Sequence, residues 1–194
     1  MANIEFVIPT YDRIDHLMCV ISSIKAQTSP NWKIHVVADC PPPTVELGKI
    51  AMYFESDKRI KFTVLKERSN DFGHTPRNFG LKNCKEDWVV MTGEDNYYAP
   101  IFVEEFLKEQ DKETNFVFCN MVTNFTNNQY IPMQCKIELG FIDIGCFMVR
   151  PELAKQIGIE TKYKEVADGV LADKYIKRFG GKVKQILKVL YVHN

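Results

Sequence analysis

The sequence has 194 residues, of which 45% are hydrophobic and 26% are charged, the balance of a globular domain with an ordinary core. Lys and Arg together number 25, as do Asp and Glu, so the formal net charge is zero and no nucleic-acid-binding surface is indicated. The apolar runs are far shorter than a membrane span, and the chain starts without a signal-peptide pattern, so we expect a cytoplasmic protein with no membrane insertion.

Short strands alternate with helices along the first half of the chain. The apolar run at residues 4–8 ends at Pro9, and apolar residues then recur at three- and four-residue steps over residues 14–24, with Asp12 placed to cap that helix. The same alternation continues with strands at residues 32–37, 60–65 and 88–92 and helices at 44–55 and 76–83. Such alternation predicts an α/β fold with a mostly parallel central sheet flanked by helices.

The second half is less regular. The expected helices are residues 101–110, a segment beginning at Pro151, and residues 166–179; the expected strands are residues 116–122, 142–149 and 183–192, with a loop at 123–129. No linker or repeat interrupts the pattern, so residues 1–194 are predicted to form a single domain. The sequence ends shortly after the last strand pattern, as a piece of a longer polypeptide would.

Polar residues concentrate where predicted strands end. Ligands of parallel sheets bind beyond the carboxyl ends of the strands, which selects residues 9–13, 39–40, 68–78 and 93–96. Within the last of these segments, Glu94-Asp95-Asn96 offers the carboxylate oxygens that hard divalent cations prefer. A solvated turn that caps the next helix is an equally good interpretation of this acidic segment alone.

Several motifs occur in a distinctive order. PTYDR at residues 9–13 lies between a strand and an amphipathic helix; QTSP at 27–30, GHTPRNFGL at 73–81 and the strand with its acidic turn at 88–100 follow. This series resembles the family-two glycosyltransferases with the GT-A (nucleotide-diphospho-sugar transferase, Rossmann-like) fold. The likeness covers most of the chain, and more loosely the last third. Within the family, the chain looks most like the small glycosyltransferase domains of chlorella viruses, which would place it in the host cytoplasm.

The resemblance implies a hexosyltransferase-type enzyme that moves a sugar from a UDP-sugar, such as UDP-glucose, to a glycan hydroxyl, with inversion and with Mn²⁺ or Mg²⁺ as the metal. Residues 1–98 would form the nucleotide-binding half and residues 99–194 the acceptor-binding half. The implied donor-binding residues are Pro9, Thr10, Tyr11, Arg13, Asp39, Arg68, Arg77, Glu94 and Asp143. Tyr11 would contact the base, Asp39 the uracil or ribose, and Glu94 the ribose.

The same resemblance implies the metal ligands and the base. Asp95 corresponds to the metal-binding acid, and His193, after the last strand, corresponds to a C-terminal metal ligand. Inverting transfer needs a carboxylate that takes the proton of the acceptor hydroxyl, for which Asp168 is the first choice and Glu165 the second. Without the resemblance, Asp168 is equally well explained as a first-turn residue favoured by the helix dipole.

Other functions are less well supported. A sugar-1-phosphate nucleotidyltransferase would carry a Gly- and Arg-rich loop after its first strand, and a dehydrogenase would carry G-x-G-x-x-G, and neither is present. The family's usual acids are replaced at Ala38, Gly93 and Ala167. A non-catalytic nucleotide-sugar-binding module derived from a transferase therefore stays open.

Overall fold

The computed structural model describes residues 2–124, 129–160, 162 and 167–194. The strands are β1 (Ile4–Thr10), β2 (Trp32–Ala38), β3 (Ile60–Val64), β4 (Trp88–Met91), β5 (Tyr97–Tyr98), β6 (Thr114–Thr123), β7 (Ile131–Met133), β8 (Phe147–Val149) and β9 (Lys182–His193). The helices are α1 (Ile14–Lys25), α2 (Val45–Phe54), α3 (His74–Asn83), α4 (Phe102–Lys108), α5 (Pro151–Ala154) and α6 (Ala167–Phe179), with a 3₁₀ turn at Ile144–Cys146.

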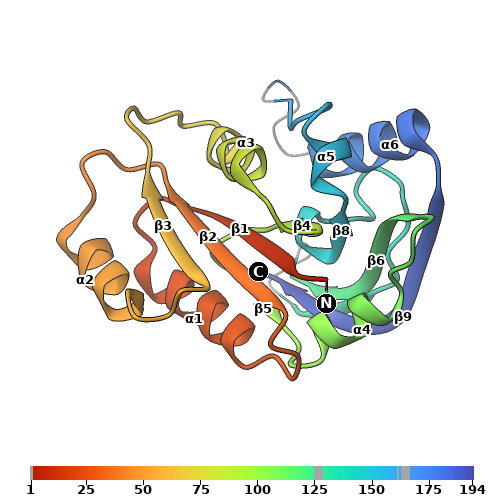
Figure 1. Cartoon of the computed structure of the whole chain (residues 1–194), viewed down its shortest axis with the longest axis horizontal. Helices are drawn as coiled ribbons and strands as arrows, with labels where there is room; N and C mark the ends of the chain where they lie inside the picture. Colours follow the sequence, from red (N-terminus) through yellow and green to blue (C-terminus); the bar gives the residue numbers. More distant parts are fainter. Residues whose placement is uncertain (1, 125–128, 161, 163–166) are drawn as a thin grey trace.

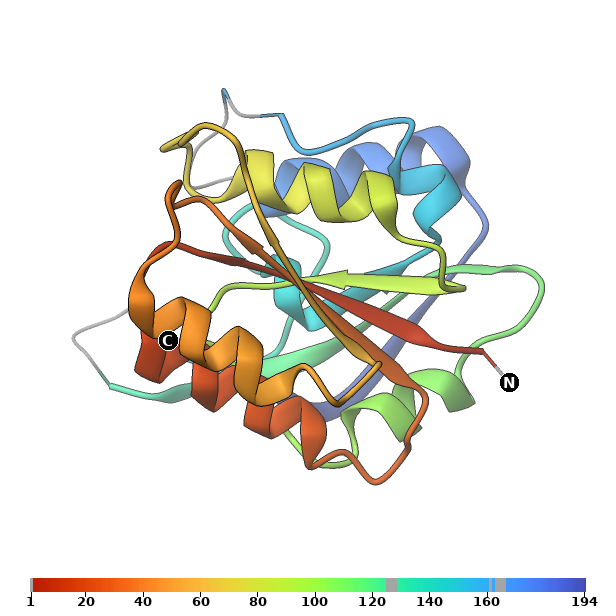
Figure 2. The same cartoon turned by 60° about the vertical axis from the view of Figure 1, so that its left-hand side comes forward.

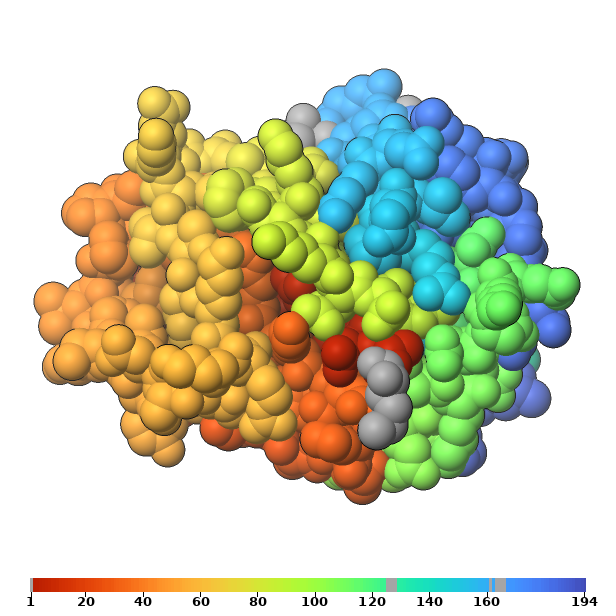
Figure 3. Space-filling model, in the orientation of Figure 1, coloured from red at the N-terminus to blue at the C-terminus, as the bar shows by residue number. Residues whose placement is uncertain are grey.

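The described strands form one nine-stranded sheet in the order β3-β2-β1-β4-β8-β6-β9-β5, with β7 paired to β6. Helices α1, α2 and α4 lie on one side of this sheet, and α3, α5 and α6 lie on the other (Figures 1 and 2). Seen from the side of Figure 1, the surface divides into an N-terminal part, in red to yellow, and a C-terminal part, in green to blue (Figure 3).

The predicted parallel arrangement is confirmed for the first four strands. β3, β2, β1 and β4 are parallel neighbours, and the register pairs Thr10 with Ala38 at the ends of β1 and β2. The second half makes the sheet mixed, because β8 runs antiparallel to both β4 and β6, and β5 runs antiparallel to β9. The parallel half therefore brings the loops after β1, β2 and β4 to one edge.

Apolar side chains explain why these elements pack as they do. Leu17, Val20 and Ile24 of α1 recur at three- and four-residue steps and are fully buried. Phe6 of β1 meets the ring of Tyr98 at 4.9 Å between centroids, which joins the two halves of the core. Among the described helices, none is long and apolar enough to cross a membrane.

Helix starts differ from the sequence-based expectations. Asp12 does not cap α1: the N-cap is Arg13, which makes no side-chain capping bond, and Asp12 has φ 105°. Helix α3 begins at His74, two residues before the expected start, because the Asp71 carboxylate accepts the backbone N–H of Thr75 at 3.0 Å.

The segment expected as a strand at residues 142–149 is shorter in the structure. The Cys146 N–H donates to the Asp143 carbonyl at 3.1 Å in the 3₁₀ turn that precedes β8, and the Asp143 side chain caps this turn by accepting the Gly145 N–H at 2.8 Å. Strands β5 and β7 were not predicted because two or three residues are too few for a periodic pattern. Part of the loop expected at 123–129 lies outside the described residues.

Candidate active site

A cavity of about 400 Å³ opens at the edge of the sheet where β1, β2 and β4 end. This volume lies within the range of small-molecule sites. The cavity brings together nine of the residues predicted from the sequence: Pro9, Thr10, Tyr11, Arg13, Asp39, Arg68, Arg77, Glu94 and Asp95. The parallel strands explain most of the convergence, because their last residues and the loops that follow them lie at one edge of the sheet; Arg77 comes instead from α3.

Asp39 lies at one end of the cavity and is buried. Its carboxylate accepts three hydrogen bonds from the segment before α3: from the Ser69 backbone N–H at 2.8 Å, the Ser69 hydroxyl at 2.8 Å and the Asn70 N–H at 3.1 Å. An ionised carboxylate has about four acceptor positions. These contacts leave about one acceptor position on Asp39 for a ligand.

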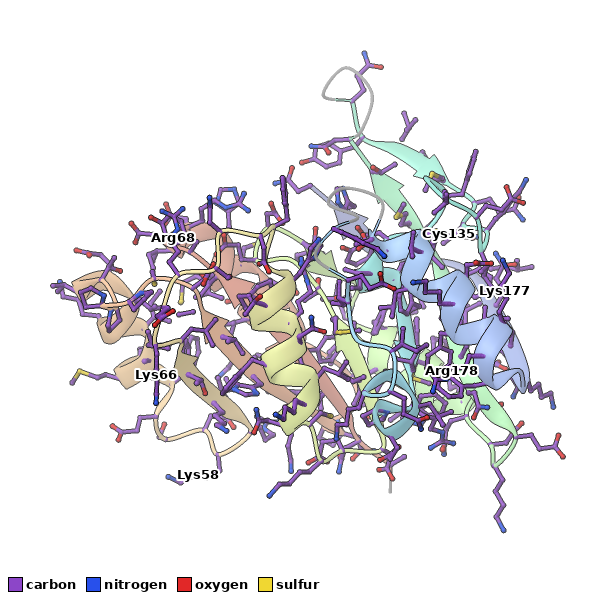
Figure 4. The ribbon with its side chains drawn as sticks, turned by 90° about the horizontal axis from the view of Figure 1, so that it is seen from above. Lys58, Lys66, Arg68, Cys135, Lys177 and Arg178 are labelled. Carbon is purple, nitrogen blue, oxygen red and sulfur yellow. The ribbon has the colours of Figure 1, made fainter. Side chains whose placement is uncertain are left out.

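Tyr11 and Arg68 form a stacked pair at the same end. The Arg68 guanidinium carbon lies 3.8 Å from the centroid of the Tyr11 ring, and its Nη2 donates to Asn70 Oδ1 at 3.3 Å. Figure 4 shows Arg68 on the side of the molecule opposite to Lys177 and Arg178 of α6. The stacked pair supplies a planar surface in the lining of the cavity.

Glu94 ties the loop after β4 to the end of β1. Its Oε2 accepts hydrogen bonds from the Thr10 hydroxyl and, at 3.2 Å, from the Tyr11 N–H. Its Oε1 accepts Arg13 Nε at 2.8 Å, and Nη1 of the same guanidinium donates to Asp95 Oδ2 at 2.9 Å. One cation therefore bridges both acids of the predicted metal motif.

Backbone strain surrounds this cavity. Asp12, between Tyr11 and Arg13, has φ 105°, and Asn70 and Phe72 have φ 51° and 60°. Non-glycine residues with positive φ are uncommon and cluster at ligand-binding sites. The strain lies in the two loops that line the cavity, as expected for loops shaped to contact a ligand.

Arg77 of α3 donates hydrogen bonds to two backbone segments beside the cavity. Its Nε donates to the Thr92 carbonyl at 2.9 Å, and its Nη1 donates to the Phe72 carbonyl at 2.8 Å. The guanidinium also lowers the pKa of Asp168, against the larger effects that raise it. Arg77 thus connects the cavity to a second group of titratable residues.

The remaining predicted residues, Asp143, Asp168 and His193, form this second group. Asp143 Oδ1 accepts the Tyr191 hydroxyl at 2.6 Å and the Gly145 N–H at 2.8 Å. Asp143 Oδ2 lies 3.3 Å from His193 Nε2. Asp143 is buried, so these donors compensate the cost of removing its charge from water.

Asp168 lies in the first turn of α6; the residue as a whole is partly exposed, but its carboxyl group is buried. Burial of its carboxyl group and, next, the negative charge of Asp143 raise its pKa, and Arg77 and the N–H of Ile144 oppose them, so that the resulting pKa is about 7. A carboxylate with a pKa near neutrality is matched to accepting a proton at neutral pH. Glu165, the alternative base, lies outside the described residues.

Asp95 and His193 are the predicted metal ligands. Asp95 lines the cavity, whereas His193 lies against Asp143 at the end of β9. The next residue, Asn194, donates its N–H to Asn96 Oδ1 at 3.4 Å, so the end of the chain meets the loop that carries Asp95. Within the described ranges, no three His, Cys, Asp or Glu side chains are placed to enclose a metal ion. This donor set fits an ion completed by a diphosphate, since Mg²⁺ commonly takes one or two carboxylates together with substrate phosphates.

Three residues of the site were not predicted individually. Ser69 and Asn70 belong to a segment that was selected from its position after a strand, but only their contacts to Asp39 show what they do. Tyr191 follows the apolar pattern of the last strand and is fully buried. No local signal distinguishes it from a core residue, and its hydroxyl reaches Asp143 only in the folded chain.

Known proteins resemble this chain in sequence and in fold. The sequence matches the profile of Glycosyl transferase family 2 over residues 5–177. An uncharacterized glycosyltransferase of Haemophilus influenzae is 26% identical over 125 residues, 61% of this chain and 40% of that protein. One from Rickettsia conorii is 29% identical over 116 residues, 60% of this chain and 18% of that protein. The chain therefore spans less than half the length of these relatives.

Two solved structures share the fold. Staphylococcus aureus TarS 1-349 in complex with UDP superposes with a TM-score of 0.79 at 18% identity, over 99% of this chain and 60% of that one. The mannosyltransferase PcManGT from Pyrobaculum calidifontis, in complex with GDP-Man and Mn²⁺, gives a TM-score of 0.74 at 16% identity, over 98% of this chain and 56% of that one. These likenesses confirm the predicted GT-A fold. With a profile match across most of its length, the chain belongs to glycosyl transferase family 2.

Proposed function

We propose that this chain is the catalytic part of an inverting glycosyltransferase that moves a sugar from a UDP-sugar to a hydroxyl group of a glycan, with a divalent metal. The observation that carries the proposal is the convergence of Asp39, Arg13, Arg77 and Asp95 on one cavity, with the Asp168 carboxyl group close enough to Arg77 for the guanidinium to lower its pKa. In this assignment, residues 1–98 bind the nucleotide and residues 99–194 bind the acceptor.

Asp39 supports uridine as the nucleoside. About one acceptor position remains on its carboxylate after the contacts to Ser69 and Asn70. Uracil presents a single ring N–H, which this position can satisfy, whereas guanine presents two adjacent donors. The ring of Tyr11, stacked on Arg68, offers a flat surface for the base. TarS, which shares the fold, was solved with UDP and with UDP-GlcNAc.

The other end of the cavity suits the diphosphate. Arg13 and Arg77 provide guanidinium groups, which bind phosphate oxygens with paired N–H donors. Asp95, with His193 as a second candidate, would hold Mn²⁺ or Mg²⁺, which when bound neutralises charge on the leaving nucleoside diphosphate. Glu94 has both carboxylate oxygens engaged by neighbouring loops, so we assign it to holding these loops, and its ribose contact stays a prediction.

Asp168 acts as the base in this mechanism. Its carboxylate takes the proton of the acceptor hydroxyl while the oxygen of that hydroxyl attacks the anomeric carbon from the face opposite the nucleotide. Asp143, held by Tyr191, Gly145 and His193, fixes a negative charge beside Asp168 and keeps its pKa high enough to receive the proton. A direct contact of Asp143 with a sugar hydroxyl remains a further prediction.

Release of UDP from a panel of UDP-sugars tests the proposal, with Mn²⁺ and with an oligosaccharide mixture as acceptor. We expect turnover with at least one donor, lost in Asp95→Ala and lowered about 10²–10⁴-fold in Asp168→Asn. Asp173→Asn, which alters an exposed carboxylate of the same helix, is the matched control and should retain activity. Tight UDP binding without turnover for any donor would instead identify a non-catalytic binding module.

The cellular setting is also part of the proposal. The sequence predicts a cytoplasmic protein and a viral source, and both stay predictions. The acceptor glycan is expected to approach from the side of α6, where Asp168 lies. Mass spectrometry of the product formed from a mixed acceptor pool would identify the sugar transferred and the glycan that receives it.

A further inference from the structure

Arg13 is placed where it competes with a metal ion. Its guanidinium contacts Asp95 Oδ2 at 2.9 Å, and Asp95 is the carboxylate proposed to hold the ion. We propose that Arg13 is the resident counterion of the donor-free site and that it releases Asp95 to the divalent cation when a nucleoside diphosphate binds. This inference rests on the proposed function, and it adds that metal and diphosphate bind in a coupled manner through Arg13.

The two contacts of Arg13 differ in their surroundings. The Glu94 side chain is 6% exposed, whereas that of Asp95 is 21% exposed. A buried carboxylate depends on its cationic partner, because removing the partner leaves an uncompensated buried charge. A pair nearer to solvent contributes less than a buried pair and is more easily exchanged. We therefore expect the Nε contact to Glu94 to persist and the Nη1 contact to Asp95 to break first.

The side chain has the freedom to make this exchange. Arg13 is 54% exposed and sits at the N-cap of α1, where it makes no capping bond. Phosphate oxygens accept guanidinium donors with paired geometry, so a diphosphate in the cavity can replace Asp95 as the partner of Nη1. Gly93 leaves the space that the Asp95 carboxylate occupies, because a Cβ at position 93 would lie 2.7 Å from Asp95 Oδ1.

Asp95 can thus bind the cation only after the Arg13 guanidinium has left Asp95 to bind the diphosphate. A cation alone has to displace the guanidinium and should bind weakly. A cation that arrives with the diphosphate does not have to displace the guanidinium. The cation and the diphosphate should therefore raise each other's affinity by the same factor. The coupling depends on the positive charge and fork shape of residue 13, because a smaller side chain cannot bridge Glu94 and Asp95.

The test measures Mn²⁺ binding by the loss of the free-ion electron paramagnetic resonance signal, with and without UDP. We expect wild type to bind Mn²⁺ weakly alone and much more tightly with UDP. Arg13→Gln should bind Mn²⁺ alone about tenfold more tightly than wild type, the effect of removing one charged contact. In this variant the enhancement by UDP should shrink by a similar factor.

Two further variants control the experiment. Arg59→Gln removes an exposed arginine that pairs with Asp57 before β3, and it should leave Mn²⁺ binding unchanged. Arg13→Lys keeps the charge but cannot bridge two carboxylates, and it should give an intermediate Mn²⁺ affinity. Because loss of Arg13 leaves Glu94 without this partner, thermal unfolding of each variant is recorded, and Arg13→Lys decides the matter if the Gln variant does not fold.

The outcomes separate this inference from the proposed function. If wild type binds Mn²⁺ with UDP but the Arg13 variants bind Mn²⁺ alone no more tightly than wild type, the counterion role is wrong and the proposed function stands. If wild type binds no Mn²⁺ even with UDP, and Asp95→Asn changes nothing, the metal dependence itself is wrong and the inference is overturned with it.

Discussion

Asp143 places a negative charge beside Asp168, and the Asp143→Asn substitution removes that charge while it keeps the shape of the side chain. The pKa of Asp168 is raised from 3.8 to about 7, by burial first and by Asp143 next. One pKa unit corresponds to about 1.4 kcal/mol. Two like charges about 4 Å apart repel by at most about 4 kcal/mol in a protein environment near the surface. Because burial persists in the variant, we expect the pKa of Asp168 to fall by about one to two units.

The sign of the effect on catalysis follows from the role of the base. Only the ionised form of Asp168 accepts a proton, so kcat/KM rises as the pH rises through its pKa. A lower pKa moves this acidic limb to lower pH, and the variant should retain a larger fraction of its own maximal rate in mildly acidic buffer than wild type does. The assay is the pH profile of UDP release at subsaturating donor.

Asp173→Asn is the matched control, because its carboxylate lies on the same helix but pairs with Lys177 at the surface. Its acidic limb should coincide with that of wild type. The reasoning is refuted if Asp143→Asn leaves the limb in place, or moves it to higher pH, while UDP binding by calorimetry is retained. Either result would mean that Asp143 does not set the protonation of Asp168.

Three other substitutions, one of them with a matched control, test separate parts of the structure. Asp168→Asn should stabilise the fold, because the raised pKa of Asp168 makes its ionisation unfavourable in the folded state. The gain in the free energy of unfolding should grow as the pH rises from the ordinary Asp pKa of 3.8 to about 7, and it should reach up to about 4 kcal/mol above pH 7. Urea unfolding at several pH values measures it. Gly80→Ala should destabilise by about 1–3 kcal/mol, because its Cβ would meet Val7 Cγ1 at 2.2 Å, whereas Gly48→Ala in the open face of α2 should be neutral or stabilising by up to about 1 kcal/mol. Asp39→Ala should weaken UDP binding about tenfold or more in calorimetry. The substitution removes the proposed contact to uracil and the hydrogen bonds that Asp39 accepts from the loop at Ser69 and Asn70.

Each of these expectations can fail independently. Equal stability of wild type and Asp168→Asn at high pH would show that the carboxylate is well solvated. A fully stable Gly80→Ala would show that α3 can move away from β1. Unchanged UDP affinity in Asp39→Ala would mean that the uracil binds elsewhere in the cavity.

The sequence predicted the lining of the cavity to the extent that it depended on neighbours in the sequence. Pro9 to Arg13 follow a strand pattern, and Glu94 and Asp95 follow another, so the rule that parallel strands end at one edge was enough to bring them together. The cap predicted at Asp12 failed for the opposite reason. The chain there turns to place Arg13 against Glu94, a contact with a distant segment that local propensity does not encode.

Contacts across the fold decided the rest. Asp143 and Asp168 are far apart in the sequence, and only the 3₁₀ turn and the first turn of α6 bring them together. The pKa near neutrality, which is central to the proposed mechanism, arises from that encounter. The antiparallel placement of β8 between β4 and β6 likewise depends on pairing between distant strands.

The sequence by itself determined the alternation of strands and helices, the parallel half of the sheet and the loops that line the cavity, because periodicity and turn residues are properties of adjacent positions. Only the tertiary structure decided the mixed second half, the bridging of both acids by Arg13 and the protonation of Asp168. Charges interact through space, and their energies depend on burial and distance between residues that the sequence separates.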